Sequence, residues 1–200
     1  VIGATMAILF RAKMQKGHTV LINGATGVTG RLAVQVAKHY GAAKIVVTGR
    51  NAESLMKLIQ LGADNIISLN QDDETIIRQL KEINTTHPID IVIDYLWGHP
   101  IELIIKSLKG GGINTFTHPV KIVTVGDMAG EEINLASGTL RSSSIEILGS
   151  GLGSLSKDDL KKFDTEILPE MFQLAANNIL TIETQVESLK TIETVWNQNI

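Results

Sequence analysis

The fold of this chain is decided by residues 22 to 31, which read Ile22-Asn23-Gly24-Ala25-Thr26-Gly27-Val28-Thr29-Gly30-Arg31. The three glycines follow the spacing G-x-x-G-x-x-G, and each permits a different backbone geometry. Gly24 permits a tight turn, Gly27 lets another group approach the backbone, and Gly30 lets a following helix pack closely on a sheet. The stretch therefore predicts a turn that leads from a strand into a helix.

The residues on either side of the glycines support this interpretation. The apolar run Thr19–Ile22 predicts a short buried strand. In the segment Val28–Tyr40, Leu32, Val36 and Tyr40 recur every fourth residue, which predicts a helix with one apolar face. The alternative is a glycine turn that serves backbone geometry only.

The rest of the chain repeats the alternation of strand and helix. Further strands are predicted at Lys44–Thr48, Asn65–Leu69, Asp90–Asp94, Lys121–Val125 and Ser144–Leu148, with a possible edge strand at Ile182–Val186. Helices are predicted at residues 4–15, 52–61, Asp73–Ile83, Ile101–Leu108, Ser156–Asn178 and Leu189–Trp196. The second of these begins after a cap at Asn51 and ends at Gly62. A break at Gly110–Gly112 follows the fourth, and Pro169 interrupts the fifth. This order predicts an α/β fold, a Rossmann doubly wound parallel sheet with helices on both faces, forming a single domain over residues 1–200.

Composition narrows the function classes. The net charge is −3 and no basic stripe is present, so we expect no nucleic-acid partner. No apolar run is long enough to span a bilayer, so we expect no membrane association and a cytoplasmic protein. The chain has no cysteine, and its five histidines show no ligand spacing, so we expect no metal site within it. No nucleophile, base and acid stand in a recognisable pattern, so no catalytic residue is predicted.

The free N–H groups at the start of the helix after the glycines predict an anion site. Backbone amides and the helix dipole favour a phosphate group at that position. Since the turn joins a strand to a helix in an alternating chain, the expected ligand is the pyrophosphate of a dinucleotide. The predicted contacts are Gly24, Ala25, Thr26, Gly27, Val28 and Thr29.

The end of the second strand bears on which dinucleotide binds. A chain that binds NAD usually places Asp or Glu there, whereas this chain reads Gly49-Arg50-Asn51. A guanidinium at Arg50 can bind the 2′-phosphate of NADPH with two hydrogen bonds, for ~1.5–3 kcal/mol. NADPH is therefore the predicted cofactor, and the alternative is that Arg50 is a solvated surface cation.

Other candidate contacts follow from position alone. Ligands of open parallel sheets lie beyond the carboxyl ends of the strands. The residues there that we predict to contact the cofactor are Asp94, Tyr95, Leu96, Val125, Gly126, Asp127, Ser150 and Gly151. For the two aspartates, capping of a turn accounts for the sequence equally well.

Four stretches of the chain together resemble a known family. They are residues 17–42, GHTVLINGATGVTGRLAVQVAKHYGA, residues 44–69, KIVVTGRNAESLMKLIQLGADNIISL, residues 90–98, DIVIDYLWG, and residues 148–155, LGSGLGSL. They resemble the cofactor domain of the medium-chain dehydrogenase/reductase superfamily, on its zinc-free quinone oxidoreductase side. One departure is Val28-Thr29, where quinone reductases often carry Gly-Val.

The resemblance carries several expectations. It implies transfer of hydride from NADPH to a small-molecule substrate, a quinone, an enone or a related carbonyl compound. It implies a homodimer formed through the sheet edge near residues 120–150, and a GroES-like catalytic domain upstream that this sequence lacks, so the chain alone is expected to be inactive. Two alternatives stay open, an atypical short-chain reductase and a non-catalytic NADPH-binding sensor or scaffold.

Overall fold

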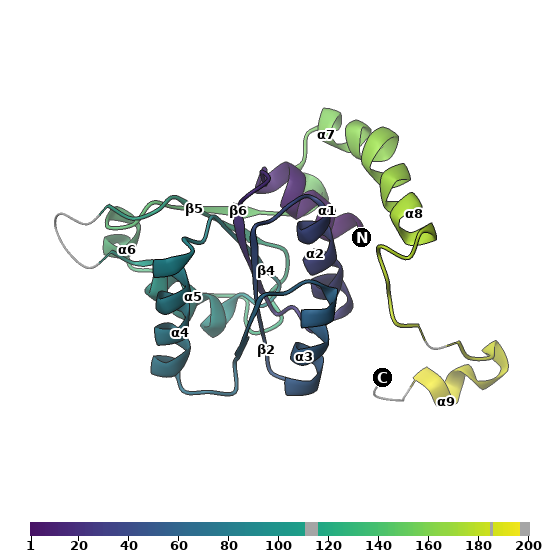
Figure 1. Ribbon diagram of the computed structural model, residues 1–200, viewed down its shortest axis with the longest axis horizontal. Coiled ribbons are helices and arrows are strands. Elements are labelled where there is room, and N and C mark those ends of the chain that lie inside the picture. Colours follow the sequence, from purple (N-terminus) through teal and green to yellow (C-terminus); the bar gives the residue numbers. More distant parts are fainter. Residues whose placement is uncertain (111–115, 185, 197–200) are drawn as a thin grey trace.

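Six parallel strands form the centre of the described structure, in the order β3-β2-β1-β4-β5-β6 (Figure 1). The structure is a computed structural model that describes residues 1–110, 116–184 and 186–196. The strands are β1 (Thr19–Asn23), β2 (Lys44–Gly49), β3 (Asn65–Ser68), β4 (Ile91–Asp94), β5 (Val120–Thr124) and β6 (Ile145–Gly149). The strand order reverses between β1 and β4, and this arrangement confirms the predicted α/β fold of Rossmann type.

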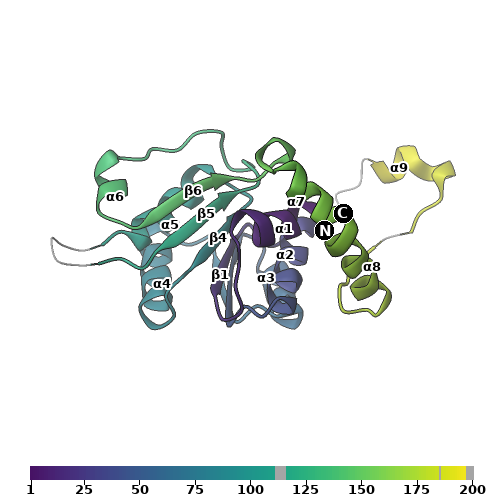
Figure 2. The same cartoon turned by 90° about the horizontal axis from the view of Figure 1, so that it is seen from above.

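Helices cover both faces of the sheet. In both views α4 and α5 lie on one side of the strands, and α1, α2 and α3 lie on the other (Figure 1 and Figure 2). The helical segments are α1 (Ile2–Thr5), η1 (Met6–Arg11), α2 (Val28–His39), α3 (Ala52–Leu61), α4 (Asp73–Thr86), α5 (Gly98–Leu108), α6 (Ser137–Arg141), η2 (Leu152–Ser154), α7 (Lys157–Lys162), η3 (Phe163–Ile167), α8 (Leu168–Ala176), η4 (Leu189–Thr191) and α9 (Ile192–Trp196). None of the described helices has the length and apolar character needed to cross a bilayer.

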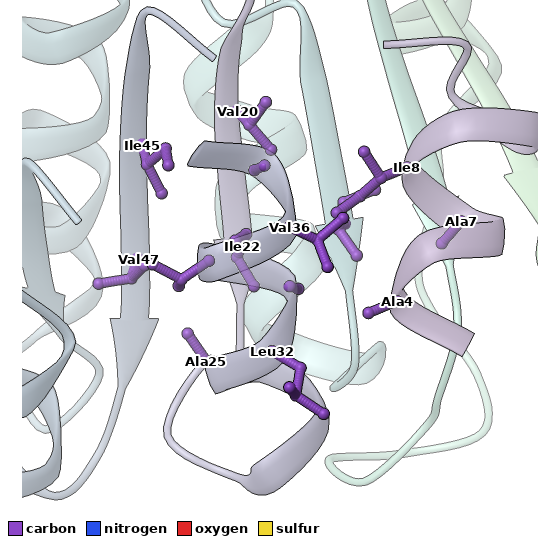
Figure 3. Close-up of a cluster of buried hydrophobic side chains, with 14 of the residues drawn as sticks. Ala4, Ala7, Ile8, Val20, Ile22, Ala25, Leu32, Val36, Ile45 and Val47 are labelled. Carbon is purple, nitrogen blue, oxygen red and sulfur yellow. The ribbon is translucent and has the colours of Figure 1, made fainter. Parts of the chain in front are cut away.

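The core consists of two apolar layers, one on each face of the sheet. Alternate residues of a strand enter opposite layers, so Val20 and Ile22 face the α2 side whereas Leu21 faces the α4 and α5 side. Figure 3 shows the first layer, in which side chains of β1, β2 and α2 meet those of the N-terminal helical segment. All three of these β1 residues are fully buried, as expected for a parallel sheet covered on both faces.

The caps of α3 are those predicted. The Asn51 side chain accepts a hydrogen bond from the Ser54 N–H at 2.8 Å, and Gly62 ends the helix with φ of +118°. An amide side chain before the first turn and a glycine in the left-handed region after the last are strong helix boundaries. These local signals explain why the ends of α3 could be predicted closely.

Several other boundaries were wrong. The N-terminal helical segment starts at Ile2 and ends at Arg11, not at residue 15, because Lys13 adopts φ of +54°. A short helix, α6, lies between β5 and β6, where the sequence predicted no helix. Of the break predicted at Gly110–Gly112, the last two residues lie outside the described part of the chain, and α5 ends before it at Leu108.

The C-terminal part also differs from expectation. The predicted interruption near Pro169 is a wider helical turn, η3, directly before α8 rather than a break. Proline has no N–H to donate to the preceding turn, which favours such a local widening. The edge strand predicted at Ile182–Val186 was wrong, because residues 182–184 and 186 form no strand, while Gln185 lies outside the described residues. Hydrogen bonds to α2 replace the pairing expected there.

Adjacent residues on α3 provide a matched test of the core. Leu58 is fully buried, whereas the next residue, Ile59, is 46% exposed. We expect Leu58→Ala to lower the free energy of unfolding by about 2–4 kcal/mol, because it leaves a cavity in the α2 layer. Ile59→Ala should change it by no more than about 0.5 kcal/mol. Urea unfolding followed by circular dichroism measures both, and equal losses would contradict the assigned orientation of α3.

Candidate functional site

The turn between β1 and α2 depends on two glycines for its own packing. Gly24 has φ of +81°, and a Cβ there would lie 2.7 Å from Cγ of Leu96. A Cβ on Gly30 would lie 2.5 Å from Cα of Ala25, closer than any real contact. Both positions therefore require glycine, the first for its backbone conformation and the second for the close approach of α2 to the turn.

Gly27 is different, because no described residue lies close enough to require glycine at this position. Its φ is −76°, and a Cβ there would meet no atom within 4 Å. The N–H groups of Gly27, Val28 and Thr29 donate to no acceptor in the part of the chain that the structure describes. The first amides of a helix lack partners within it, so this turn presents N–H groups on an open surface.

A chain of buried hydrogen bonds joins the ends of three neighbouring strands. The Thr48 hydroxyl donates to Oδ1 of Asn23 at 2.6 Å, and Nδ2 of Asn23 donates to Oδ1 of Asp94 at 2.7 Å. All three side chains are completely buried. The Gly24 N–H donates to the Thr48 hydroxyl oxygen at 3.1 Å. The turn of residues 24–30, here named the phosphate turn after the ligand group predicted for it, is therefore anchored to the same network. Asn23 and Thr48 were not predicted as site residues, although each is a polar residue at the end of an apolar run.

Asp94 belongs to this network and does not face the open groove. Its carboxylate also accepts hydrogen bonds from the N–H groups of Leu96, at 3.0 Å, and Trp97, at 3.2 Å. The pKa of the Asp94 carboxyl is raised above its ordinary value, because the effect of burial exceeds that of the hydrogen bonds from Leu96, Asn23 and Trp97, which lower it. Asp94 therefore caps the turn after β4. Turn capping was one of the two roles considered for Asp94 from the sequence, and contact with the ligand was the other.

An open groove of about 1080 Å³ lies at the carboxyl edge of the sheet, where β1 and β4 adjoin. Its lining includes most of the predicted contact residues. The lining residues are Gly24, Thr26, Gly27, Val28, Thr29, Gly30, Gly49, Arg50, Asn51, Leu69, Tyr95, Leu96, Gly126 and Met128. Sequence reasoning missed Leu69 and Met128, because nothing in their immediate sequence marks an apolar residue as part of a groove.

Five other predicted contacts are not among the lining residues. Ala25 is fully buried beneath the turn, and Val125 packs against the apolar layer on the α2 side. Asp127 is exposed in the loop after β5, where its carbonyl accepts the N–H of Gly130. Ser150 and Gly151 follow β6, the edge strand, which lies two strands away from β4. These contacts were predicted because each residue directly follows a strand. That criterion does not distinguish strands next to the reversal of strand order from strands at the edge of the sheet.

The end of β2 supplies the polar part of the groove. A Cβ on Gly49 would lie 2.5 Å from Cγ2 of Thr26, so glycine permits the phosphate turn to approach this strand. The side-chain oxygen Oδ1 of Asn51 is used to cap α3, as described above. Arg50 is exposed and forms no ion pair with a carboxylate among the described residues. Arg50 is also the one charged residue of the described groove lining.

Tyr95 lines the same groove from the end of β4. Its hydroxyl oxygen is buried and has no hydrogen-bond partner among the described residues. Burial raises the pKa of the Tyr95 phenol, so the hydroxyl stays protonated at neutral pH. A neutral phenol can both donate and accept a hydrogen bond.

Comparison with known proteins identifies the family. The model of the family described as zinc-binding dehydrogenase matches residues 28–170. The chain belongs to this family. It is the cofactor domain of a medium-chain dehydrogenase/reductase, as the resemblance implied. Among the described residues no three His, Cys, Asp or Glu side chains lie together as a group that could hold a metal ion.

The relatives include quinone oxidoreductases. Human quinone oxidoreductase is 28% identical over 160 residues, which are 80% of this chain and 45% of that protein. Quinone oxidoreductase-like protein 2 of Mus musculus is 25% identical over 168 residues, 84% of this chain and 45% of that protein. The chain thus spans less than half the length of these relatives. Escherichia coli quinone oxidoreductase, solved in complex with NADPH, shares the fold with a TM-score of 0.73 at 22% identity, over 92% of this chain and 53% of that one.

Two glycines of the turn should respond differently to alanine. Gly30→Ala places a methyl group 2.5 Å from the Ala25 backbone, and we expect it to lower the free energy of unfolding by about 1–3 kcal/mol. Gly27→Ala meets no atom within 4 Å and should leave stability within about 0.5 kcal/mol of the unaltered chain. Chemical denaturation of both variants measures this, and a stable Gly30→Ala chain would refute the close packing of α2.

Proposed function

We propose that this chain binds NADPH in the groove at the carboxyl edge of its sheet. We further propose that it is the cofactor domain of an oxidoreductase that reduces a quinone, an enone or a related carbonyl compound. The observation that carries the proposal is the open row of N–H groups at Gly27, Val28 and Thr29, located where the strand order reverses. Ligands of open α/β sheets bind at that reversal.

The donor set fits a pyrophosphate. The N–H groups of the turn and the positive end of the α2 dipole favour two linked phosphates, while Gly27 keeps a side chain out of their path. Asn23, Thr48 and Asp94 hold the turn from below, so the amides keep their positions before any ligand arrives. Binding then requires little ordering of the backbone, which lowers its cost in free energy.

The end of β2 supports NADPH over NADH. Arg50 is positively charged, exposed and near the first turn of α3, and no carboxylate lies among the described groove-lining residues. A guanidinium can bind the 2′-phosphate through two parallel hydrogen bonds. A carboxylate, which would accept the ribose 2′-hydroxyl of NADH, does not occur at this position.

Four other lining residues of the groove suit the nicotinamide. Tyr95, Leu96, Gly126 and Met128 line the groove and offer a mainly apolar surface for a flat ring. When bound there, NADPH supplies the hydride for reduction. The relatives named quinone oxidoreductase, and the Escherichia coli member solved with NADPH, support this substrate class and cofactor. Since the chain spans about half the length of these relatives, we propose that the residues enclosing the substrate are supplied from outside it and that the chain alone turns over little.

We also propose that the chain forms a homodimer through β6. This strand is an edge of the sheet and pairs with β5 on one side only, and its residues Ile145 and Ile147 are half-buried in the described chain. An edge strand with free backbone groups is suited to pairing with a second copy. Analytical ultracentrifugation should then give twice the 21.7 kDa mass of the chain, and a monomer at micromolar concentration would contradict the proposal.

Replacement of Arg50 tests the choice of cofactor. We expect Arg50→Ala to weaken NADPH binding about tenfold or more and to leave NADH binding unchanged, because only NADPH carries the 2′-phosphate. Isothermal titration calorimetry measures both affinities. Arg78→Ala removes an exposed arginine of α4 that pairs with Glu82, and serves as a matched control without effect on either ligand. Equal losses for NADPH and NADH in Arg50→Ala would eliminate the proposed role.

A further inference from the structure

One face of α2 is polar and contacts the C-terminal part of the chain. Arg31, Gln35 and His39 are spaced four residues apart and therefore lie along one side of the helix. The His39 ring lies 2.9 Å from a carboxylate oxygen of Glu170 on α8. Gln35 and Arg31 contact the segment after α8. The C-terminal part of the chain therefore runs along this face of α2 toward the phosphate turn.

The side-chain amide of Gln35 forms two hydrogen bonds with the backbone of that segment, one as donor and one as acceptor. The Gln35 side-chain N–H donates to the Thr181 carbonyl at 3.0 Å, and the Thr181 N–H donates to the Gln35 side-chain oxygen at 2.8 Å. Gln35 is only 6% exposed, so water competes little for these two hydrogen bonds. They fix the backbone two residues before Glu183.

Arg31 joins Glu183 to the phosphate turn. Its Nη1 donates to a carboxylate oxygen of Glu183 at 2.7 Å, and its Nε donates to the Thr26 carbonyl at 3.0 Å. The guanidinium is planar, so the first hydrogen bond orients the second. Lys57 lies 3.9 Å from the other carboxylate oxygen of Glu183, which keeps that carboxylate between two cations.

The hydrogen bond to Thr26 determines where the next amide points. No peptide bond in the described chain is cis, so the Gly27 N–H points opposite to the Thr26 carbonyl of the same planar unit. Because Arg31 holds the carbonyl on one flank of the turn, the amide faces the other flank. Gly27 lines the groove, so a carbonyl oxygen is kept away from the expected anion and an N–H is offered instead.

We infer that Arg31 is a positioning residue for the phosphate turn and that Glu183, brought there by the C-terminal segment, holds Arg31 in place. This inference rests on the proposed function, since it concerns how the turn receives the cofactor's pyrophosphate. Residues 181–183 are therefore part of the geometry of the cofactor site. Exposed ion pairs contribute little to overall stability, so the effect is local to the turn.

Two replacements of Arg31 separate geometry from charge. Arg31→Met removes both the charge and the hydrogen bond to Thr26, whereas Arg31→Lys keeps the charge and loses the planar fork. We expect both variants to weaken NADPH binding about tenfold, measured by calorimetry, because each frees the Thr26–Gly27 peptide to rotate. Adenosine 2′-monophosphate carries the 2′-phosphate but no pyrophosphate, so its affinity should stay unchanged in both variants.

Two further variants complete the design. Arg78→Met on α4 removes an arginine paired with a carboxylate at 3.2 Å and should alter neither affinity. Glu183→Met should weaken NADPH binding in the unaltered chain but have no additional effect in Arg31→Met, because it acts only through Arg31. Melting temperatures of all variants should agree with that of the unaltered chain.

The outcomes are distinguishable. If Arg31→Lys binds NADPH as well as the unaltered chain does, Arg31 acts through its charge alone and the inference is overturned. Equal losses for NADPH and adenosine 2′-monophosphate would show a general disturbance of the site and overturn it too. If the unaltered chain binds no NADPH, the proposed function itself fails and the inference fails with it.

Discussion

The candidate cofactor site depends on a buried chain of hydrogen bonds at the carboxyl edge of the sheet. Thr48, Asn23 and Asp94 come from three neighbouring strands, β2, β1 and β4, and have no exposed surface. Polar groups buried in an apolar core are costly unless they are paired, and here each is paired with its neighbour or with a backbone amide. The network holds the ends of β2, β1 and β4 in register, and the phosphate turn begins at the end of β1, the middle strand of the three.

The same network explains how the site acquires its polarity. The Asp94 carboxyl accepts hydrogen bonds from the N–H groups of Leu96 and Trp97 and from the Asn23 amide, so it faces the protein interior and not the groove. The turn above it presents N–H groups outward, and Arg50 is the one charged residue in the described lining of the groove. The groove thus favours an anion even though the whole chain carries a net charge of −3. Local arrangement, and not overall composition, decides what the site attracts.

Helix α2 connects the turn to distant parts of the chain. Its apolar face packs between the sheet and the N-terminal helical segment, with Leu32 and Val36 buried (Figure 3). Its polar face contacts α8 and residues 181–183 through His39, Gln35 and Arg31. The last helix, α9, lies apart from the sheet in both views (Figure 1 and Figure 2). The C-terminal segment is therefore bound to the domain mainly where it follows α2.

The sequence by itself determined the α/β fold and the position of the glycine turn between β1 and α2. Both depend on local signals, namely apolar periodicity, glycine spacing and the caps at Asn51 and Gly62, which act between residues close in the chain. Only the tertiary structure decided which strand ends meet at the groove, so Leu69 and Met128 line it whereas Ser150 and Gly151 do not. It also decided that Asp94 faces inward. These outcomes depend on contacts between residues far apart in sequence, such as Asn23 with Asp94 or Arg31 with Glu183. The periodicity of apolar residues along the chain does not predict such contacts.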